Sequence, residues 1–225
     1  MTRVIAGSLL SVILVSSSFV AVNRGLSSLF ASPGNSRLAI WREGKHQPQQ
    51  HDWEKVRGSL EKAMSYDSRN PDLLHALGAV YEAEFVYLIP GDTAARKNRD
   101  IARQYYLRAL SGRPSWPHDW IDLALVKYRL DQIDAEFYRA MRQAVVLGPW
   151  EPWVQYVVAD IGMRNWYQFD NEMHKLIIGV IHDGMQHNPE EMFKLVRRYD
   201  MLEVVCNSGR GAEQVMNYCA RYQHH

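Results

Sequence analysis

The sequence is poor in cysteine. Among its 225 residues only Cys206 and Cys219 are cysteines, and neither belongs to a CxxC motif. A structural zinc site needs more ligands of this kind, so the cysteines offer no such site. Two alternatives remain for the pair: small buried thiols in a reducing compartment, or a disulfide in an oxidising one. A disulfide would contribute about 3 kcal/mol in the chain-entropy model.

The sequence also lacks an excess of charge of either sign. It contains 26 Lys and Arg residues against 25 Asp and Glu residues, and it has no long run of like charges. Binding to nucleic acid phosphates needs a surplus of basic side chains on one face. The composition therefore argues against nucleic acid as a partner. Hydrophobic residues make up 47% of the chain, which is enough for a packed core.

Signatures of catalysis are absent as well. The sequence contains no GxSxG, Walker loop, GxGxxG or HExxH motif. Its nine histidines do not cluster with the spacing of metal ligands. We therefore expect a protein that is not an enzyme and that uses no cofactor or metal. A glycan hydrolase is the enzyme alternative, because it needs only two carboxylates that face a shared cleft.

An uncharged segment lies near the N-terminus. Residues 4–23 contain no charged side chain, and an arginine flanks them on each side. Twenty helical residues are about 30 Å long, which is the thickness of a bilayer core. The apolar stretch 9–15 also has the length of a signal-peptide core, and serines follow it. Residues 1–24 are therefore a signal-anchor or a cleaved signal peptide. We favour the anchor, because apolar residues resume at 19–22.

Turn-forming residues dominate the next segment. Serine, proline, glycine and asparagine gather in residues 27–36, and a QPQQ sequence follows later, so we predict a linker over 25–51. From residue 52 onward, apolar residues recur at intervals of three and four, as in helices. The dipeptides Asn70-Pro71 and Asn188-Pro189 are typical of helix starts. No alternation of period two indicates a sheet, so the sequence predicts an all-α protein.

An internal repeat is the strongest pattern in the sequence. Tetratricopeptide units combine a large residue, Leu-Gly and Tyr in a first helix with Ala, an aromatic residue and a closing Pro in a second. The first match reads Leu74-x2-Leu77-Gly78-x2-Tyr81, followed by Ala102-x3-Tyr106-x2-Ala109 and Pro114. The pattern recurs at Trp120-x2-Leu123-Ala124, at Ala144 and Pro149, and at Gly184 and Pro189. An insertion at 85–96 departs from it. We predict a tetratricopeptide-like superhelix of helical hairpins over 52–225, preceded by one N-terminal hydrophobic helix.

A groove for partners follows from this prediction. In tetratricopeptide superhelices the first helix of each unit lines a concave face, formed by the residues that packing does not use. The candidate groove residues are Asp72, His75, Glu82, His118, Tyr128, Trp153, Tyr156 and Asp160. Such a face suits a peptide segment or a sugar chain, whose apolar surfaces stack on Trp and Tyr. The alternative for Trp153 and Tyr156 is a packing role in the core.

The overall layout resembles a known family. The N-terminal hydrophobic segment leads into Arg37-Leu38-Ala39-Ile40-Trp41, and segments rich in proline and tryptophan follow at 113–117 and 147–153. In this layout the chain resembles the VpsP-type polysaccharide biosynthesis proteins of bacterial exopolysaccharide clusters. Its helical style is also similar to the repeat tails of O-antigen ligase-like membrane proteins. The resemblance implies an accessory role in making or exporting an extracellular polysaccharide, and it supplies no catalytic residues.

These observations lead to one expected function and one alternative function. We expect a single-pass inner-membrane scaffold that contacts the membrane through residues 4–23 and whose helical domain lies in the periplasm. It would bind proteins of a polysaccharide assembly system, or the glycan itself. The alternative is a general cell-envelope adaptor or chaperone-like repeat protein that is unrelated to polysaccharide.

Overall fold

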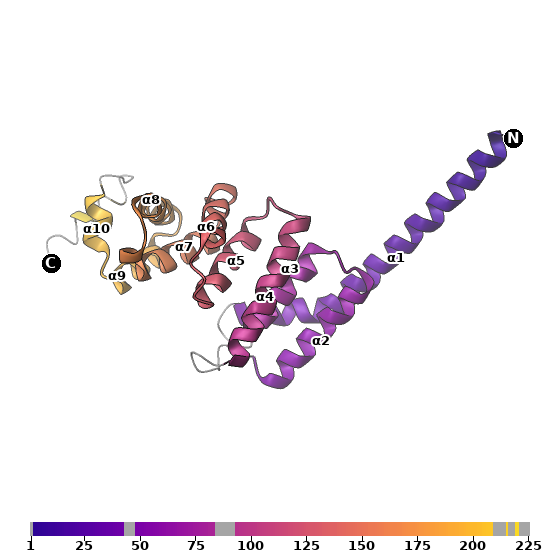
Figure 1. The fold of residues 1–225 in the computed structure, drawn as a ribbon, viewed down its shortest axis with the longest axis horizontal. Helices are drawn as coiled ribbons and strands as arrows, with labels where there is room; N and C mark the ends of the chain where they lie inside the picture. The colour runs from indigo at the N-terminus through magenta and orange to yellow at the C-terminus, as the bar shows by residue number, and fades with distance from the viewer. Residues whose placement is uncertain (1, 43–47, 84–92, 209–214, 216–218, 221–225) are drawn as a thin grey trace. The chain divides into compact units, whose positions relative to one another are not determined.

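The fold is all-α, as the sequence predicts. The computed structural model describes residues 2–42, 48–83, 93–208, 215 and 219–220, with the backbone alone for 2–12, and these residues contain no strand. The helices are α1 (Thr2–Arg42), α2 (Gln50–Tyr66), α3 (Pro71–Ala83), α4 (Thr93–Gly112), α5 (Pro117–Arg129), α6 (Ala135–Leu147), α7 (Pro152–Arg164), the 3-10 helix η2 (Trp166–Gln168), α8 (Asn171–His187), α9 (Pro189–Arg198) and α10 (Leu202–Asn207) (Figure 1). Most of the insertion predicted at 85–96 lies outside the described residues, and α4 begins at Thr93.

The chain divides into two compact units, residues 1–113 and residues 114–225. Within unit 1, α1 packs on α2 and α3 packs on α4. Within unit 2, α5 packs on α6 and α7 packs on α8. The first helices of successive pairs also contact each other, α1 with α3 and α5 with α7. Short connections, such as residues 130–134 between α5 and α6, make paired helices antiparallel neighbours. Helical hairpins are therefore the building blocks of both units.

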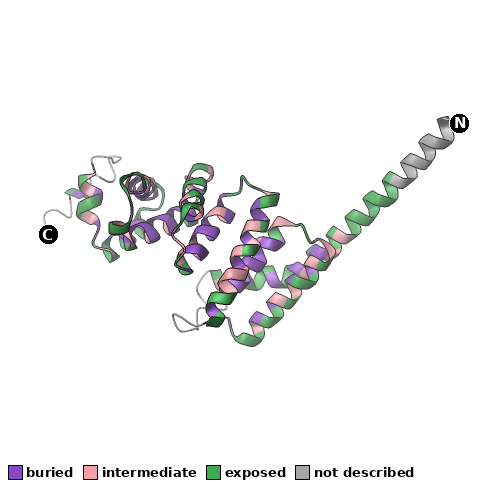
Figure 2. Ribbon diagram, viewed as in Figure 1, coloured by how far each residue is buried: buried purple, intermediate pink, exposed green. Residues whose placement is uncertain are grey.

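One helix in the described part of the chain is long and apolar enough to cross a membrane. This segment of α1, residues 13–42, contains a window of mean hydropathy 1.3, of which 6% is buried. Residues 13–22 are exposed, and this part of the protruding helix is green in Figure 2. The predicted N-terminal hydrophobic helix is therefore confirmed. By length and composition it is compatible with a single-pass membrane anchor.

The linker predicted over 25–51 is helical from 25 to 42, so that part of the prediction is wrong. Three small residues and one leucine recur at helical spacing there and form the buried stripe of α1: Ser27, Ala31, Gly34 and Leu38. A Cβ atom added at Gly34 would lie 2.7 Å from the hydroxyl oxygen of Ser59 on α2. The small side chains therefore let α1 and α2 approach closely, and this packing outweighs their preference for turns.

Helix starts follow the sequence in part. Asn70 accepts a hydrogen bond from the backbone N–H of Asp72 at 2.9 Å, so the predicted start of α3 is confirmed. Helix α9 begins at Pro189 as predicted, but the Asn188 side chain makes no capping hydrogen bond. With ψ at 64°, Asn188 does not have the extended backbone of a typical cap residue.

The residues of the first predicted repeat match lie in the core of the α3–α4 hairpin. The first-match residues from Leu74 to Ala109 are buried: Leu74, Leu77, Gly78, Tyr81, Ala102, Tyr106 and Ala109. A Cβ atom at Gly78 would lie 2.6 Å from the Tyr106 ring, so α3 and α4 cross closely at this point. In unit 2, Gly162 lies equally close to Ile177, where α7 crosses α8. Gly78 thus has the packing role predicted for it, and Gly162, which the predicted pattern did not include, has the same role in unit 2.

Candidate functional site

The predicted groove residues of unit 1 make contacts within the protein. Asp72 is exposed at the start of α3 and forms an ion pair with Arg113. The imidazole Nε2 of His75 lies 2.7 Å from Nη2 of Arg42, which joins α3 to the end of α1. These two predicted residues thus help to hold unit 1 together.

The third predicted residue of unit 1 closes a hairpin. Glu82 lies near the end of α3 and accepts a hydrogen bond at 2.7 Å from the hydroxyl of Tyr106 on α4. The Tyr106 ring is fully buried, and its hydroxyl reaches Glu82 at the edge of the core. The Glu82 carboxylate satisfies a polar group that would otherwise end in apolar surroundings.

Unit 2 presents the more open of the predicted surfaces. Trp153 lies at the start of α7, and its side chain is 41% exposed. Its indole Nε1 donates a hydrogen bond at 2.7 Å to Oδ1 of Asp122, a buried residue on α5. The ring stacks on Tyr156, with centroids 6.0 Å apart and planes 11° apart. Trp153 is therefore a fixed and partly exposed aromatic platform, not a core residue.

A hydrogen-bonded cluster follows along α7. The hydroxyl of Tyr199, at the end of α9, donates to Oδ1 of Asp160 at 2.6 Å. Arg164 donates to the same hydroxyl at 2.7 Å and pairs with Asp160 at 3.5 Å. Burial, together with the hydrogen bond to Asp160, raises the pKa of Tyr199 to about 12. The half-buried Tyr128 on α5 interacts electrostatically with Arg164, which places it beside this cluster.

The other end of the same surface carries a histidine. The His118 Nε2 atom lies 3.7 Å from a carboxylate oxygen of Glu151, which precedes α7. The exposed ring of Trp116 lies 5.8 Å from the His118 ring.

We name the surface formed by α5 and α7 the α5–α7 face. Its residues are His118, Asp122, Tyr128, Trp153, Tyr156 and Asp160, with Arg164 and Tyr199 at its edge. All five groove residues predicted in unit 2 lie on it, whereas Asp122, Arg164 and Tyr199 were not predicted from the sequence.

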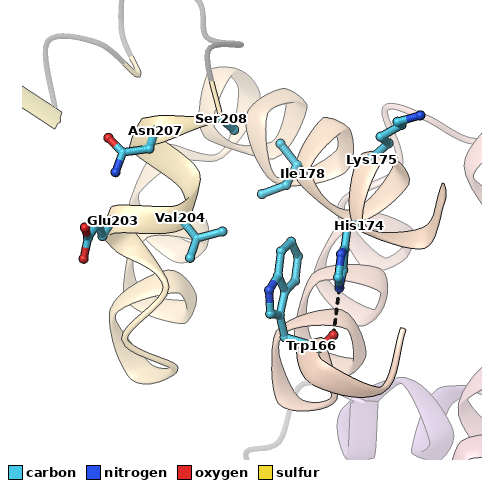
Figure 3. Close-up of a pocket in the computed structure, with 8 residues that line it drawn as sticks. All are labelled: Trp166, His174, Lys175, Ile178, Glu203, Val204, Asn207 and Ser208. Atoms are coloured by element: carbon cyan, nitrogen blue, oxygen red, sulfur yellow. Dashed lines mark hydrogen bonds between the residues drawn. The ribbon is translucent and has the colours of Figure 1, made fainter. Parts of the chain in front are cut away.

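A cleft elsewhere in unit 2 was not predicted from the sequence either (Figure 3). It has a volume of about 540 Å³ and lies between α8 and α10, with η2 at one end. Its lining residues are Trp166, His174, Lys175, Ile178, Glu203, Val204, Asn207 and Ser208. The rings of Trp166 and His174 stack with centroids 3.9 Å apart, and His174 Nε2 lies 2.8 Å from the Trp166 carbonyl oxygen. No motif links the two walls, because the lining residues of α8 and those of α10 are 25 or more positions apart in the chain.

Cys206 precedes Asn207, which lines this cleft. Cys206 on α10 is bonded to Cys219, with their Cα atoms 5.8 Å apart. Of the two alternatives that the sequence left open, the structure has the disulfide. The bond ties α10, and with it one wall of the cleft, to the C-terminal segment.

Within the described part of the chain, no group of three or more His, Cys, Asp or Glu side chains is arranged to hold a metal ion. A scan of protein-family models found no match to this chain. A search of curated proteins also found no match. The function must therefore be inferred from the surfaces described above.

Proposed function

We propose that the protein is a non-catalytic, membrane-anchored accessory protein of bacterial exopolysaccharide biosynthesis or export. It binds partner proteins or the glycan through the α5–α7 face. The observation that carries this proposal is the exposed Trp153–Tyr156 stack, which Asp122 holds in one orientation. Exposed aromatic rings with neighbouring hydrogen-bonding groups are typical of surfaces that bind sugars or peptides.

A repeat scaffold is supported by the packing of the hairpins. In both units the first helix of one pair contacts the first helix of the next. The small residues of the tetratricopeptide pattern, such as Gly78 and Ala124, are buried at the expected positions. We therefore propose a tetratricopeptide-like superhelix. In such a scaffold the α5–α7 face corresponds to the face that the first helices present to partners.

The envelope location is supported by two features. Helix α1 has the length and composition of a membrane span. The bond between Cys206 and Cys219 is of a kind that persists in oxidising compartments such as the bacterial periplasm. We propose an inner-membrane protein with a single span and a periplasmic helical domain. The layout that resembles the VpsP-type proteins points to the same place and to polysaccharide as the context.

The carboxylates of the α5–α7 face favour binding over hydrolysis. Glycoside hydrolysis needs one carboxyl group as acid and a second as base or nucleophile. Asp122 accepts the indole N–H of Trp153, and Asp160 accepts the hydroxyl of Tyr199. Both carboxylates therefore hold aromatic side chains in position, which is a role that a binding surface requires.

The test compares two exposed tryptophans of unit 2. Trp153→Ala removes the platform, whereas Trp150→Ala removes a more exposed ring that contacts His187 instead of the α5–α7 face. Binding of the host's purified exopolysaccharide to the full-length protein in detergent would be measured by calorimetry. We expect Trp153→Ala to weaken binding by about tenfold or more, and Trp150→Ala to leave it nearly unchanged. Equal affinity for both variants and the native protein would contradict a glycan role for this face.

Affinity capture distinguishes the partner-protein role from the envelope-adaptor alternative. The full-length native protein and its Trp153→Ala variant would be used as baits in detergent-solubilised membranes. Recovery of glycosyltransferases or export proteins with the native bait, and their loss with the variant, supports the proposal. Recovery of unrelated envelope proteins alone favours the adaptor. Circular dichroism of both baits shows whether the substitution has disturbed the fold.

A further inference from the structure

The turn between α2 and α3 lies beside the point where the uncharged part of α1 ends. Arg24 is the first charged residue after the run 4–23. Its Nε atom lies 3.9 Å from Oδ2 of Asp67, which follows the last residue of α2. The turn is therefore level with the end of the uncharged run 4–23.

A second contact keeps this end of the hairpin against α1. The rings of Phe30 on α1 and Tyr66 on α2 stack with centroids 5.4 Å apart, and the ammonium of Lys62 lies 3.9 Å from the Phe30 ring centre. From residue 24 to residue 30 a helix rises about 9 Å. The polar layer of a bilayer is about 5–8 Å thick on each side. For a span that ends at Arg24, the turn is at the level of the lipid headgroups, and the contact between Phe30 and Tyr66 lies at their outer edge.

Basic side chains gather at this end of unit 1. Arg24, Lys62, Arg69 and Arg108 are all exposed, and we name them the basic end of unit 1. Arg108 comes from the last turns of α4 and donates to the Ser68 carbonyl oxygen at 3.4 Å, which places it beside the turn. The neighbouring acids are engaged: Asp67 with Arg24, and Asp72 with Arg113.

We propose that the basic end of unit 1 binds anionic phospholipid headgroups at the surface of the membrane that α1 spans. The proposal rests on the membrane anchoring of the proposed function, but not on its glycan or partner role. Basic side chains next to a span are attracted to anionic lipids, and the attraction fades within a Debye length. The short distance between the turn and Arg24 brings this cluster within that range.

The experiment uses the full-length protein in nanodiscs that contain phosphatidylcholine and phosphatidylglycerol. Because both native cysteines are bonded, a Ser68→Cys substitution supplies one thiol for a donor fluorophore on the turn. Energy transfer is measured to an acceptor on the headgroup of either lipid, in separate samples. We expect transfer to labelled phosphatidylglycerol to exceed transfer to labelled phosphatidylcholine severalfold, and the excess to vanish at high salt.

Matched charge reversals locate the effect. Arg69→Glu with Arg108→Glu should abolish the preference for phosphatidylglycerol. Arg96→Glu with Lys97→Glu makes the same charge change near the start of α4, about 17 Å along the helix from Arg108, and should retain the preference. No preference in the native sequence, or equal loss in both double variants, overturns the proposal.

Carbonate extraction separates this proposal from the anchoring on which it rests. Release of the protein from membranes by alkaline carbonate would overturn both the anchor and the lipid site. Retention in the membrane without a lipid preference would overturn the lipid site alone. Neither result bears on the α5–α7 face, which lies in unit 2.

Discussion

The indole Nε1 of Trp153 donates a hydrogen bond to Oδ1 of Asp122 at 2.7 Å, across the contact between α7 and α5. Asp122 is 6% exposed, so its carboxylate has little access to water. The bond satisfies a buried acceptor and at the same time fixes a ring that is 41% exposed. The platform of the α5–α7 face therefore depends on a residue beneath the surface.

Replacing Asp122 should disturb both stability and the orientation of Trp153. Asp122→Ala leaves the indole N–H without this acceptor, and we expect the free energy of unfolding to fall by about 1–3 kcal/mol. Asp122→Asn keeps an acceptor oxygen and should lose less. Urea unfolding measures the stability, and the indole N–H resonance of Trp153 in NMR spectra reports the hydrogen bond. An unshifted resonance in Asp122→Ala would contradict the assigned contact.

Two glycines in unit 1 should respond to alanine in opposite directions. At Gly78 the new Cβ would lie 2.6 Å from the Tyr106 ring, so we expect Gly78→Ala to destabilise the protein by about 1–3 kcal/mol. At Gly58, within α2, a Cβ meets nothing within 4 Å. Gly58→Ala should therefore stabilise the protein by up to about 1 kcal/mol, because alanine favours the helix. Both values come from urea unfolding, and equal effects at the two sites would contradict close packing at Gly78.

The Tyr199 hydroxyl should titrate late, that is, at a higher pH than the hydroxyl of an ordinary tyrosine. Burial and the hydrogen bond to Asp160 raise its pKa to about 12, from an ordinary value of 10.0. Because the folded state keeps this proton longer, the contribution to stability is complete below about pH 10 and is lost as the pH rises towards 12. Ultraviolet absorbance of tyrosinate follows the titration. Asp160→Asn should lower the pKa of Tyr199, whereas Tyr167→Phe, at a residue that is 97% exposed, should leave the late transition in place.

Lys127 carries an ammonium group that is buried within unit 2. Its side chain is 2% exposed, and its Nζ lies 2.9 Å from a carboxylate oxygen of Asp134 and 2.8 Å from one of Glu136. Asp134→Asn with Glu136→Gln leaves this charge uncompensated, so we expect a loss of about 3–5 kcal/mol in the free energy of unfolding. Lys127→Met removes the charge but keeps the apolar stem, and it should cost far less. Similar losses of unfolding free energy in the two variants would contradict the view that the uncompensated buried charge causes the loss.

The Asp134 carboxyl group links this ion pair to pH. Burial acts to raise its pKa, but hydrogen bonds from Lys127 and from the backbone amides of Phe137 and Glu136 outweigh this and hold the pKa below its ordinary value of 3.8. Its contribution to stability is therefore present above about pH 3.8 and is lost as the pH falls through the lower folded-state value.

The sequence predicted the features that depend on local spacing. The helices and the packing roles of Gly78 and Tyr106 follow from intervals of three and four and from the repeat pattern. The α1 stripe of small residues was misinterpreted, because Ser27 and Gly34 are turn formers by composition and only their contact with α2 favours a helix. Because residues 25–51 were predicted to be a linker, the contact between Arg42 and His75 was not predicted either.

Other features depend on how distant segments meet. The pairing of Asp122 with Trp153 requires a particular register between α5 and α7, which no local pattern encodes. The cleft beside Trp166 forms only because α10 packs near α8, where the disulfide of Cys206 helps to hold it. Such contacts join residues far apart in the chain, and a single sequence does not reveal them.

Helix α1 runs without interruption from the uncharged segment to Arg42, and unit 1 packs on its second half. If the first half crosses the bilayer as proposed, a change in the tilt of this half also moves the second half of α1. A span adapts to a thicker or thinner bilayer by changing its tilt. Residues 25–42 extend about 27 Å beyond the span, so a change of roughly 10° in tilt moves the end of α1 by about 5 Å. The thickness of the membrane would thereby set the angle at which the first hairpins stand over its surface, a quantity that polarised infrared dichroism can measure in bilayers of different chain lengths.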